Sequence, residues 1–104
     1  MDTAPTVRFV DVARRLAAAS RGAGLIVPVF RTPPRRPGAS RTIRRLPGGP
    51  VVSVHVRARP FSDVVADMVD GVVLANGLGG DAAGRVRATL LDAAYRERPP
   101  ARVA

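Results

Sequence analysis

The strongest constraint on how this chain can fold is a segment near its middle that cannot take up regular secondary structure. Residues 31–40 read RTPPRRPGAS and contain three prolines and one glycine. Proline fixes its own φ angle and has no backbone N–H, so this spacing excludes both a helix and a central strand. We expect an extended, polyproline-like and mobile loop here, which separates the elements before it from those after it.

Three strands are predicted around this loop. The apolar, β-branched run at 25–30 fits one strand, and Pro28 places it at a sheet edge or at a bulge, because proline cannot donate to a ladder. Residues 41–46 form a weaker strand and residues 51–59 a clear one. The sequence PGGP at 47–50 joins these two as a tight hairpin connection.

The predicted strand at 51–59 alternates between apolar and polar positions. Its apolar set is Val52, Val54, Val56 and Ala58, and its polar set is Ser53, His55, Arg57 and Arg59. Successive side chains of a strand point to opposite faces, so this pattern is typical of an antiparallel strand that is buried on one side. The sequence therefore predicts a sheet with one solvent-exposed, basic face.

Helices are predicted on both sides of the strands. The first lies within residues 6–21, where apolar side chains recur at helical spacing. The second covers residues 61–75, carries a broad valine stripe and ends in a left-handed C-cap at Asn76 and Gly77. The third lies between Asp81, which fits an N-cap, and Pro99, which stops it.

The order α, β, β, β, α, α predicts an α+β domain over residues 6–98. Its strands form a three-stranded antiparallel meander with the helices packed on one face. Residues 1–5 are expected to form a frayed tail, and residues 99–104 a second tail. In topology the chain resembles double-stranded-RNA-binding domains. In those domains a basic turn precedes the helix after the third strand, whereas this chain has Ser62 and Asp63 there.

The apolar residues are mostly small. The chain has sixteen valines and seven leucines but only four aromatic residues. A core built mainly of valine and alanine is thin, because each side chain buries little area. We therefore expect marginal stability or a contribution from self-association.

Positive charge is concentrated in the first part of the chain. The net charge is +9, and the first sixty residues hold twelve arginines and two aspartates, whereas the remainder holds five arginines and six acids. From Phe30 to Arg59 there are eight arginines and no acid. A biased coding sequence explains the absence of lysine but not the absence of acids from this stretch. The asymmetry indicates a face that binds a polyanion.

The predicted function is that of a small, basic, non-enzymatic module that binds nucleic acid. Arginine presents a planar fork of donors that matches phosphate, so the contacts are expected to be mainly with the backbone. Phe30 and Phe61 are the only aromatic residues near the patch, which favours duplex or structured nucleic acid with weak sequence preference. The predicted contact residues are Arg31, Arg35, Arg36, Arg41, Arg44, Arg45, His55, Arg57 and Arg59.

The alternative interpretation is a protein-interaction or homo-oligomeric subunit. In that case the helix at 61–75 buries its valine stripe in a homodimer or against a partner. The basic loop then docks on an acidic protein. A mass that depends on concentration, without binding to nucleic acid, would favour this alternative.

Signals for catalysis, cofactors and metals are weak. The chain has no cysteine and one histidine, so no catalytic constellation, metal site or cofactor is predicted. Gly77, Gly79 and Ala82 match a dinucleotide-binding spacing, but the helical stripe before them favours a turn between helices. The aspartates Asp63, Asp67 and Asp70 share one helix face, and we interpret them as a solvated or arginine-pairing surface rather than a cation site.

Neither a signal peptide nor a membrane span is predicted. Charged residues interrupt the N-terminal apolar residues, and no apolar run approaches the eighteen or so residues that span a bilayer. A cytoplasmic protein with no membrane partner is the expectation.

Overall fold

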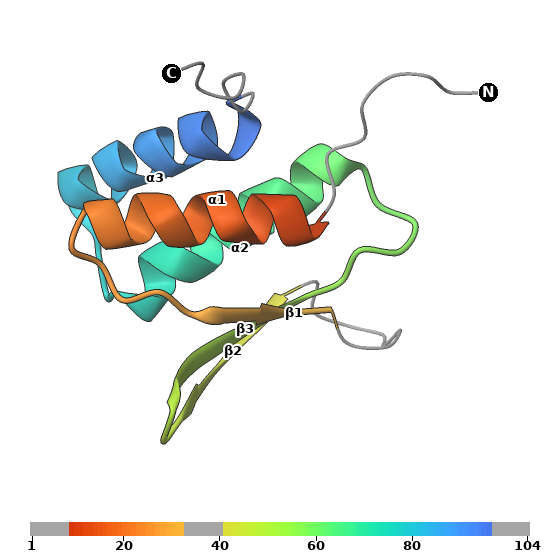
Figure 1. Ribbon diagram of the computed structural model, residues 1–104, viewed down its shortest axis with the longest axis horizontal. Helices are drawn as coiled ribbons and strands as arrows, with labels where there is room; N and C mark the ends of the chain where they lie inside the picture. Colours follow the sequence, from red (N-terminus) through yellow and green to blue (C-terminus); the bar gives the residue numbers. More distant parts are fainter. Residues whose placement is uncertain (1–8, 33–40, 97–104) are drawn as a thin grey trace, which may run out of the picture.

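The computed structural model describes residues 9–32 and 41–96 as three helices and three strands (Figure 1). In chain order these elements are α1 (Phe9–Gly22), β1 (Val29–Arg31), β2 (Arg41–Leu46), β3 (Gly49–Val54), α2 (Phe61–Ala75) and α3 (Gly80–Tyr95). The α+β class and the order of elements are confirmed. Within the described ranges, no helix has both the length and the apolar character needed to cross a membrane.

The sheet is mixed, so the predicted antiparallel meander is wrong. Strand β3 is central, with β2 antiparallel on one side and β1 parallel on the other. The two-residue turn between Leu46 and Gly49 fixes the hairpin of β2 and β3 locally. By contrast, nothing near β1 in the sequence specifies its neighbour, and the long connection to β2 allows β1 to add to the free edge of β3. The topological resemblance to double-stranded-RNA-binding domains fails for the same reason.

The edge strand β1 is shorter than its apolar run suggested. It covers Val29–Arg31 and begins directly after Pro28, which is consistent with the expected edge position. The predicted loop at 31–40 is wrong at its first residue, because Arg31 pairs with Ser53 of β3. It pairs in register with Val51–Ser53 of β3. The residues between α1 and β1 are therefore a connection rather than part of the strand.

Strand β3 also ends earlier than predicted, at Val54 rather than Arg59. The chain turns through residues 55–60, where Ala58 has a φ of 56°, a left-handed conformation that non-glycine residues rarely adopt. Helix α2 must return over the sheet from this point. Period-2 alternation continues through the turn in the sequence, so the pattern alone could not show where the strand stops.

Valine dominates the core between the helices and the sheet. The buried cluster contains Val12, Leu16, Val52, Val54, Val64, Val65, Met68, Val69, Val72, Leu90 and Ala94. Helix α2 lies directly on β3, and an ideal Cβ at Gly71 would lie 2.5 Å from Cγ1 of Val52. Real Cβ atoms do not approach that closely, so the close contact is possible because glycine has no Cβ.

Two helices end in the same hydrogen-bonded motif. After α1, Leu25 N–H bonds to Ser20 O and Gly24 N–H to Arg21 O, with Gly24 at a φ of 75°. After α2, Leu78 N–H bonds to Val73 O and Gly77 N–H to Leu74 O, with Gly77 at a φ of 66°. Both are Schellman motifs, so the predicted left-handed C-cap at Gly77 is confirmed.

One asparagine fastens the end of α2 to the segment that precedes β1. The Asn76 side chain accepts a hydrogen bond from Ile26 N–H at 2.8 Å and donates one to Ile26 O at 3.0 Å. Its Nδ2 also donates to Val72 O at 2.9 Å. An amide that satisfies both backbone groups of one residue acts as a short strand partner, so it fixes how the chain enters β1.

Candidate nucleic-acid interface

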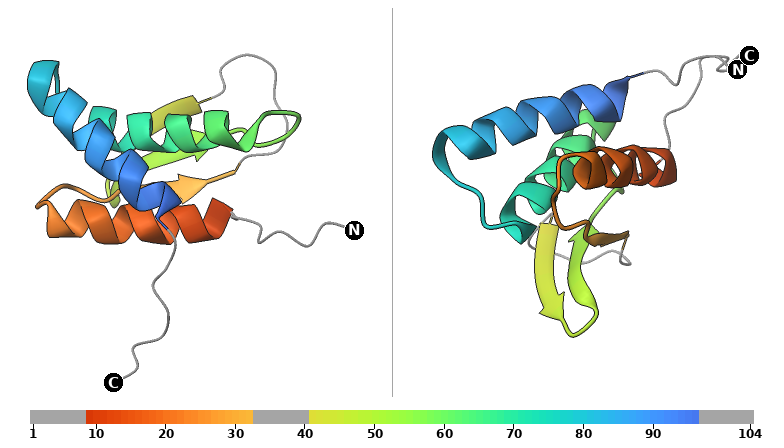
Figure 2. Two further views of the ribbon diagram at one scale, coloured as in Figure 1. Left: turned by 90° about the horizontal axis from the view of Figure 1, so that it is seen from above. Right: turned by 60° about the vertical axis from the view of Figure 1, so that its left-hand side comes forward.

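The two faces of the sheet differ in what covers them. The inner face carries Val52 and Val54 of β3, with Phe30 and Ile43 as their neighbours, and packs against the helices. All described helices lie on that side, and the opposite face is open among the described elements (Figures 1 and 2). Side chains of paired residues point to the same face, so the open face carries Val29, Arg31, Thr42, Arg44, Leu46, Val51 and Ser53.

Two predicted contact residues, Arg31 and Arg44, lie on this outer face. Both side chains are exposed. Arg31 is opposite Ser53 on one side of β3, and Arg44 is opposite Val51 on the other. Two strand spacings and a two-residue offset put their Cα atoms about 12 Å apart. The sheet therefore holds two guanidinium groups at a fixed separation on one surface.

Arg45 has a different role from its neighbour. Its side chain points to the inner face, where Nη2 donates to Leu74 O and Nη1 to Ala75 O, both at 3.3 Å. These carbonyls belong to the last two residues of α2, and a cation at a helix C-terminus is favoured by the helix dipole. Arg45 thus fastens the hairpin to α2, and the period of two along a strand explains why adjacent arginines differ.

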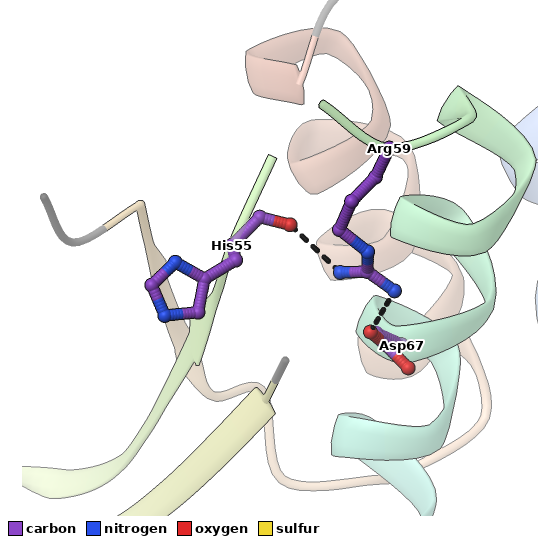
Figure 3. Close-up of polar contacts among 3 residues, drawn as sticks. All are labelled: His55, Arg59 and Asp67. Carbon is purple, nitrogen blue, oxygen red and sulfur yellow. Dashed lines mark hydrogen bonds and ion pairs between the residues drawn. The ribbon is translucent and has the colours of Figure 1, made fainter. Parts of the chain in front are cut away.

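Arg59 also stabilises the fold, at the other end of β3. Its Nη1 donates to His55 O at 2.8 Å, and its Nη2 is 2.6 Å from Oδ2 of Asp67 on α2 (Figure 3). The Arg59 side chain is 20% exposed and that of Asp67 is 15% exposed. Charge-assisted bonds in a partly buried setting are stronger than those at the surface, so Arg59 holds the turn at 55–60 against α2.

The remaining predicted residues fall into two groups. Arg57 is exposed in the turn after β3, and the partly buried His55 directs its ring away from the Arg59–Asp67 pair (Figure 3). Arg41 begins β2 opposite Val54, but its side chain lies outside the described part of the structure. The predictions at Arg35 and Arg36 likewise fall outside the described residues.

Acidic residues in the described ranges are confined to the helices. They are Asp11, Asp63, Asp67, Asp70, Asp81 and Asp92. Several contact arginines: Asp70 pairs with Arg87, Asp92 with Arg96 and Asp11 with Arg14. Between Leu25 and Pro60 the chain has no acid at all. The helical layer is thus close to neutral, whereas the sheet layer carries only positive charge.

The aspartates of α2 behave as a pairing surface for arginines. Asp67 contacts Arg59 and Asp70 contacts Arg87 of α3. Within the described ranges, no group of three or more histidine, cysteine or acidic residues could hold a metal ion. The pairing interpretation is supported at these two positions.

Two polar contacts between elements had no clear signal in the sequence. Arg15 of α1 donates from Nη1 to Ala94 O at 2.8 Å, near the end of α3. Asn76 was expected as part of a helix cap, but its double bond to Ile26 joins residues fifty positions apart. No local pattern encodes such a contact, because its partner is brought in by the fold.

Comparison with protein families, with curated proteins and with solved structures found no match to this chain.

Proposed function

We propose that the protein is a non-enzymatic module that binds nucleic acid through the outer face of its sheet. The observation that carries the proposal is the placement of Arg31 and Arg44. Both are exposed on the open face, and neither side chain makes a hydrogen bond or an ion pair to another described residue. With no acid between Leu25 and Pro60, their positive potential is not cancelled locally.

The contacts are mainly with phosphate. A guanidinium can donate two parallel hydrogen bonds to phosphate oxygens and keeps its charge at any physiological pH. Arg57 extends the basic surface along the turn after β3, and His55 adds a donor when protonated. Arg35, Arg36 and Arg41 stay predicted contacts from the sequence. Arg45 and Arg59 hold the surface in place rather than contact the ligand.

A duplex or structured partner is favoured over an unpaired strand. Binding of single strands relies on aromatic side chains on which bases stack. Phe30 and Phe61 were the candidates, and both pack against the hydrophobic core. The outer face within the described strands carries aliphatic, hydroxyl and guanidinium side chains, which suit contact with a backbone.

A protein partner is the second candidate, and one observation favours it. Val29 is 60% exposed and Leu46 is 43% exposed, both on the outer face. Apolar side chains beside arginines suit an interface with an acidic protein. The valine stripe of α2, in contrast, lies in the core of the monomer, so a dimer through this helix would use other residues, such as the exposed Leu74.

Salt dependence of binding tests the proposal and counts the contacts. Fluorescence anisotropy with labelled duplex DNA, duplex RNA and single-stranded DNA is measured at about 50 and 200 mM salt. Three phosphate contacts predict about 40-fold weaker duplex DNA binding at the higher salt, and six predict about a thousandfold or more. The smaller change is what contacts from Arg31, Arg44 and Arg57 alone would give, and the larger is what six contacts, with Arg35, Arg36 and Arg41 added, would give. Absence of salt-dependent binding to any ligand contradicts the proposal.

A further inference from the structure

The hairpin of β2 and β3 projects from the body of the protein (Figures 1 and 2). Strand β1 pairs with β3 at Val51–Ser53, so the hairpin is two strands wide only from Arg45 to Pro50, and Arg44 lies at the base of this part, opposite Val51. Pro47 and Gly48 form the tip and are exposed, and Gly49 has a φ of 120°. The result is a narrow ribbon that ends in two small residues.

We infer that this ribbon enters the major groove of B-form DNA with its outer face toward the base edges. The inference rests on the proposed function and adds that the ligand is B-form DNA, bound in its major groove. The major groove of B-DNA is about 12 Å wide and admits a two-stranded ribbon. The major groove of A-form RNA is too deep and narrow to be read by side chains, so the same ribbon has no equivalent site there.

The outer face of the hairpin carries side chains that can contact base edges. Arg44 is exposed at the base of the two-stranded part, and behind it, where β1 makes the sheet three strands wide, Thr42 is exposed and Ser53 is partly exposed. Arginine is the residue type that most often contacts guanine, through O6 and N7, while serine and threonine bond to several bases. The exposed Leu46 can contact a thymine methyl group. Arg44 is therefore the residue that selects guanine.

The hairpin is held in a fixed orientation on its other face. Arg45 bonds to the carbonyls of Leu74 and Ala75 at the end of α2, which ties the inner face of the ribbon to the helical layer. At the flank, Arg31 on β1 lies on the same face as Arg44 and can reach a phosphate at the groove edge. Base contact and backbone contact thus come from one rigid surface.

The first experiment compares ligands that differ only in groove geometry and groove chemistry. One guanine-containing duplex is made as DNA, as RNA, and as DNA with every guanine replaced by 7-deazaguanine, which lacks the N7 acceptor. We expect the DNA duplex to bind at least about tenfold more tightly than the other two. Equal affinity for all three, with a steep salt dependence, overturns the groove inference and leaves the proposed function intact. Absence of salt-dependent binding to all three overturns both.

Two variants of Arg44 then separate the effect of its planar guanidinium donors from the effect of its positive charge. Arg44→Lys keeps the charge, so the salt dependence should stay the same, while the preference for guanine over 7-deazaguanine should fall because the ammonium lacks the planar pair of donors. Arg44→Ser should weaken DNA binding by about 5- to 100-fold. Arg85→Ser, an exposed arginine on α3, is the matched control and should change affinity little. Retained sensitivity to 7-deazaguanine in both Arg44 variants overturns the inference.

Discussion

The helical layer and the sheet layer use the same residue, arginine, in opposite ways. In the helical layer, Arg87 and Arg96 pair with nearby aspartates, and the charges nearly balance. In the sheet layer no acid is present, and Arg31 and Arg44 are directed away from the core. The number of arginines therefore says little about a binding surface. What matters is whether an acid or a helix terminus lies within reach of each one.

Two pairs of arginines close in sequence show this contrast at single-residue scale. Arg45 contacts the end of α2, whereas Arg44 beside it is exposed on the outer face. Arg59 contacts Asp67, whereas Arg57 is exposed in the same turn. Each pair offers two substitutions with the same change in charge and different expected effects on stability and binding.

The largest effect is expected where the two layers touch. Gly71→Ala places a methyl group against Val52, whose Cγ1 would lie 2.5 Å away. Overpacking of this kind lowers the free energy of unfolding by about 1–3 kcal/mol, and the better helix propensity of alanine offsets part of that loss. Urea denaturation measures the net change in the free energy of unfolding. Gly84→Ala on α3, where a Cβ meets nothing within 4 Å, should not destabilise the protein and serves as the control.

The next largest difference in stability is expected between two substitutions in the turn after β3. Arg59→Gln removes the charge-assisted contacts with His55 O and Asp67 and should lower the free energy of unfolding by about 1–2 kcal/mol. Arg57→Gln should leave stability within about 0.5 kcal/mol of the parent and weaken nucleic-acid binding. Denaturation and anisotropy on both variants measure the two effects. Equal stability of the two variants would mean that the Arg59 contacts contribute nothing to the fold.

Substitutions of Arg45 and Arg44 in the hairpin should also differ in stability, by a smaller amount. Arg45→Ser loses two long hydrogen bonds to α2, so a loss of about 0.5–1 kcal/mol in stability is expected. Arg44→Ser should keep the parent stability, because its exposed side chain makes no hydrogen bond or ion pair to another described residue. Thermal denaturation of the two variants tests the distinction. If Arg44→Ser is the less stable of the two, the assignment of the sheet faces is wrong.

The smallest expected effect is a gain in stability. Ser20 on α1 is fully buried, and its Oγ has no hydrogen-bond partner in the described structure. Ser20→Ala removes that desolvated hydroxyl and improves helix propensity, so the free energy of unfolding should rise by about 0.5–1 kcal/mol. Calorimetry would show a higher Tm. A lower Tm would indicate that the hydroxyl does form a bond in solution.

The elements themselves follow closely from the sequence. Apolar spacing and the residues that end helices, such as Gly77, act over a few positions, so they predict type and order without reference to the rest of the fold. The turn at 55–60 was missed because alternation continues through it and only Ala58 adopts an unusual conformation.

The sequence by itself determined the three helices, the three strands, their order and the excess of arginine between Leu25 and Pro60. Only the tertiary structure decided that β1 joins β3 in parallel, that Arg45 and Arg59 are bound to α2, and that Arg31 and Arg44 share an open face. The reason is the range of the interactions. Helix caps and periodic burial act between near neighbours, whereas strand pairing and arginine contacts depend on which distant segments the core brings together.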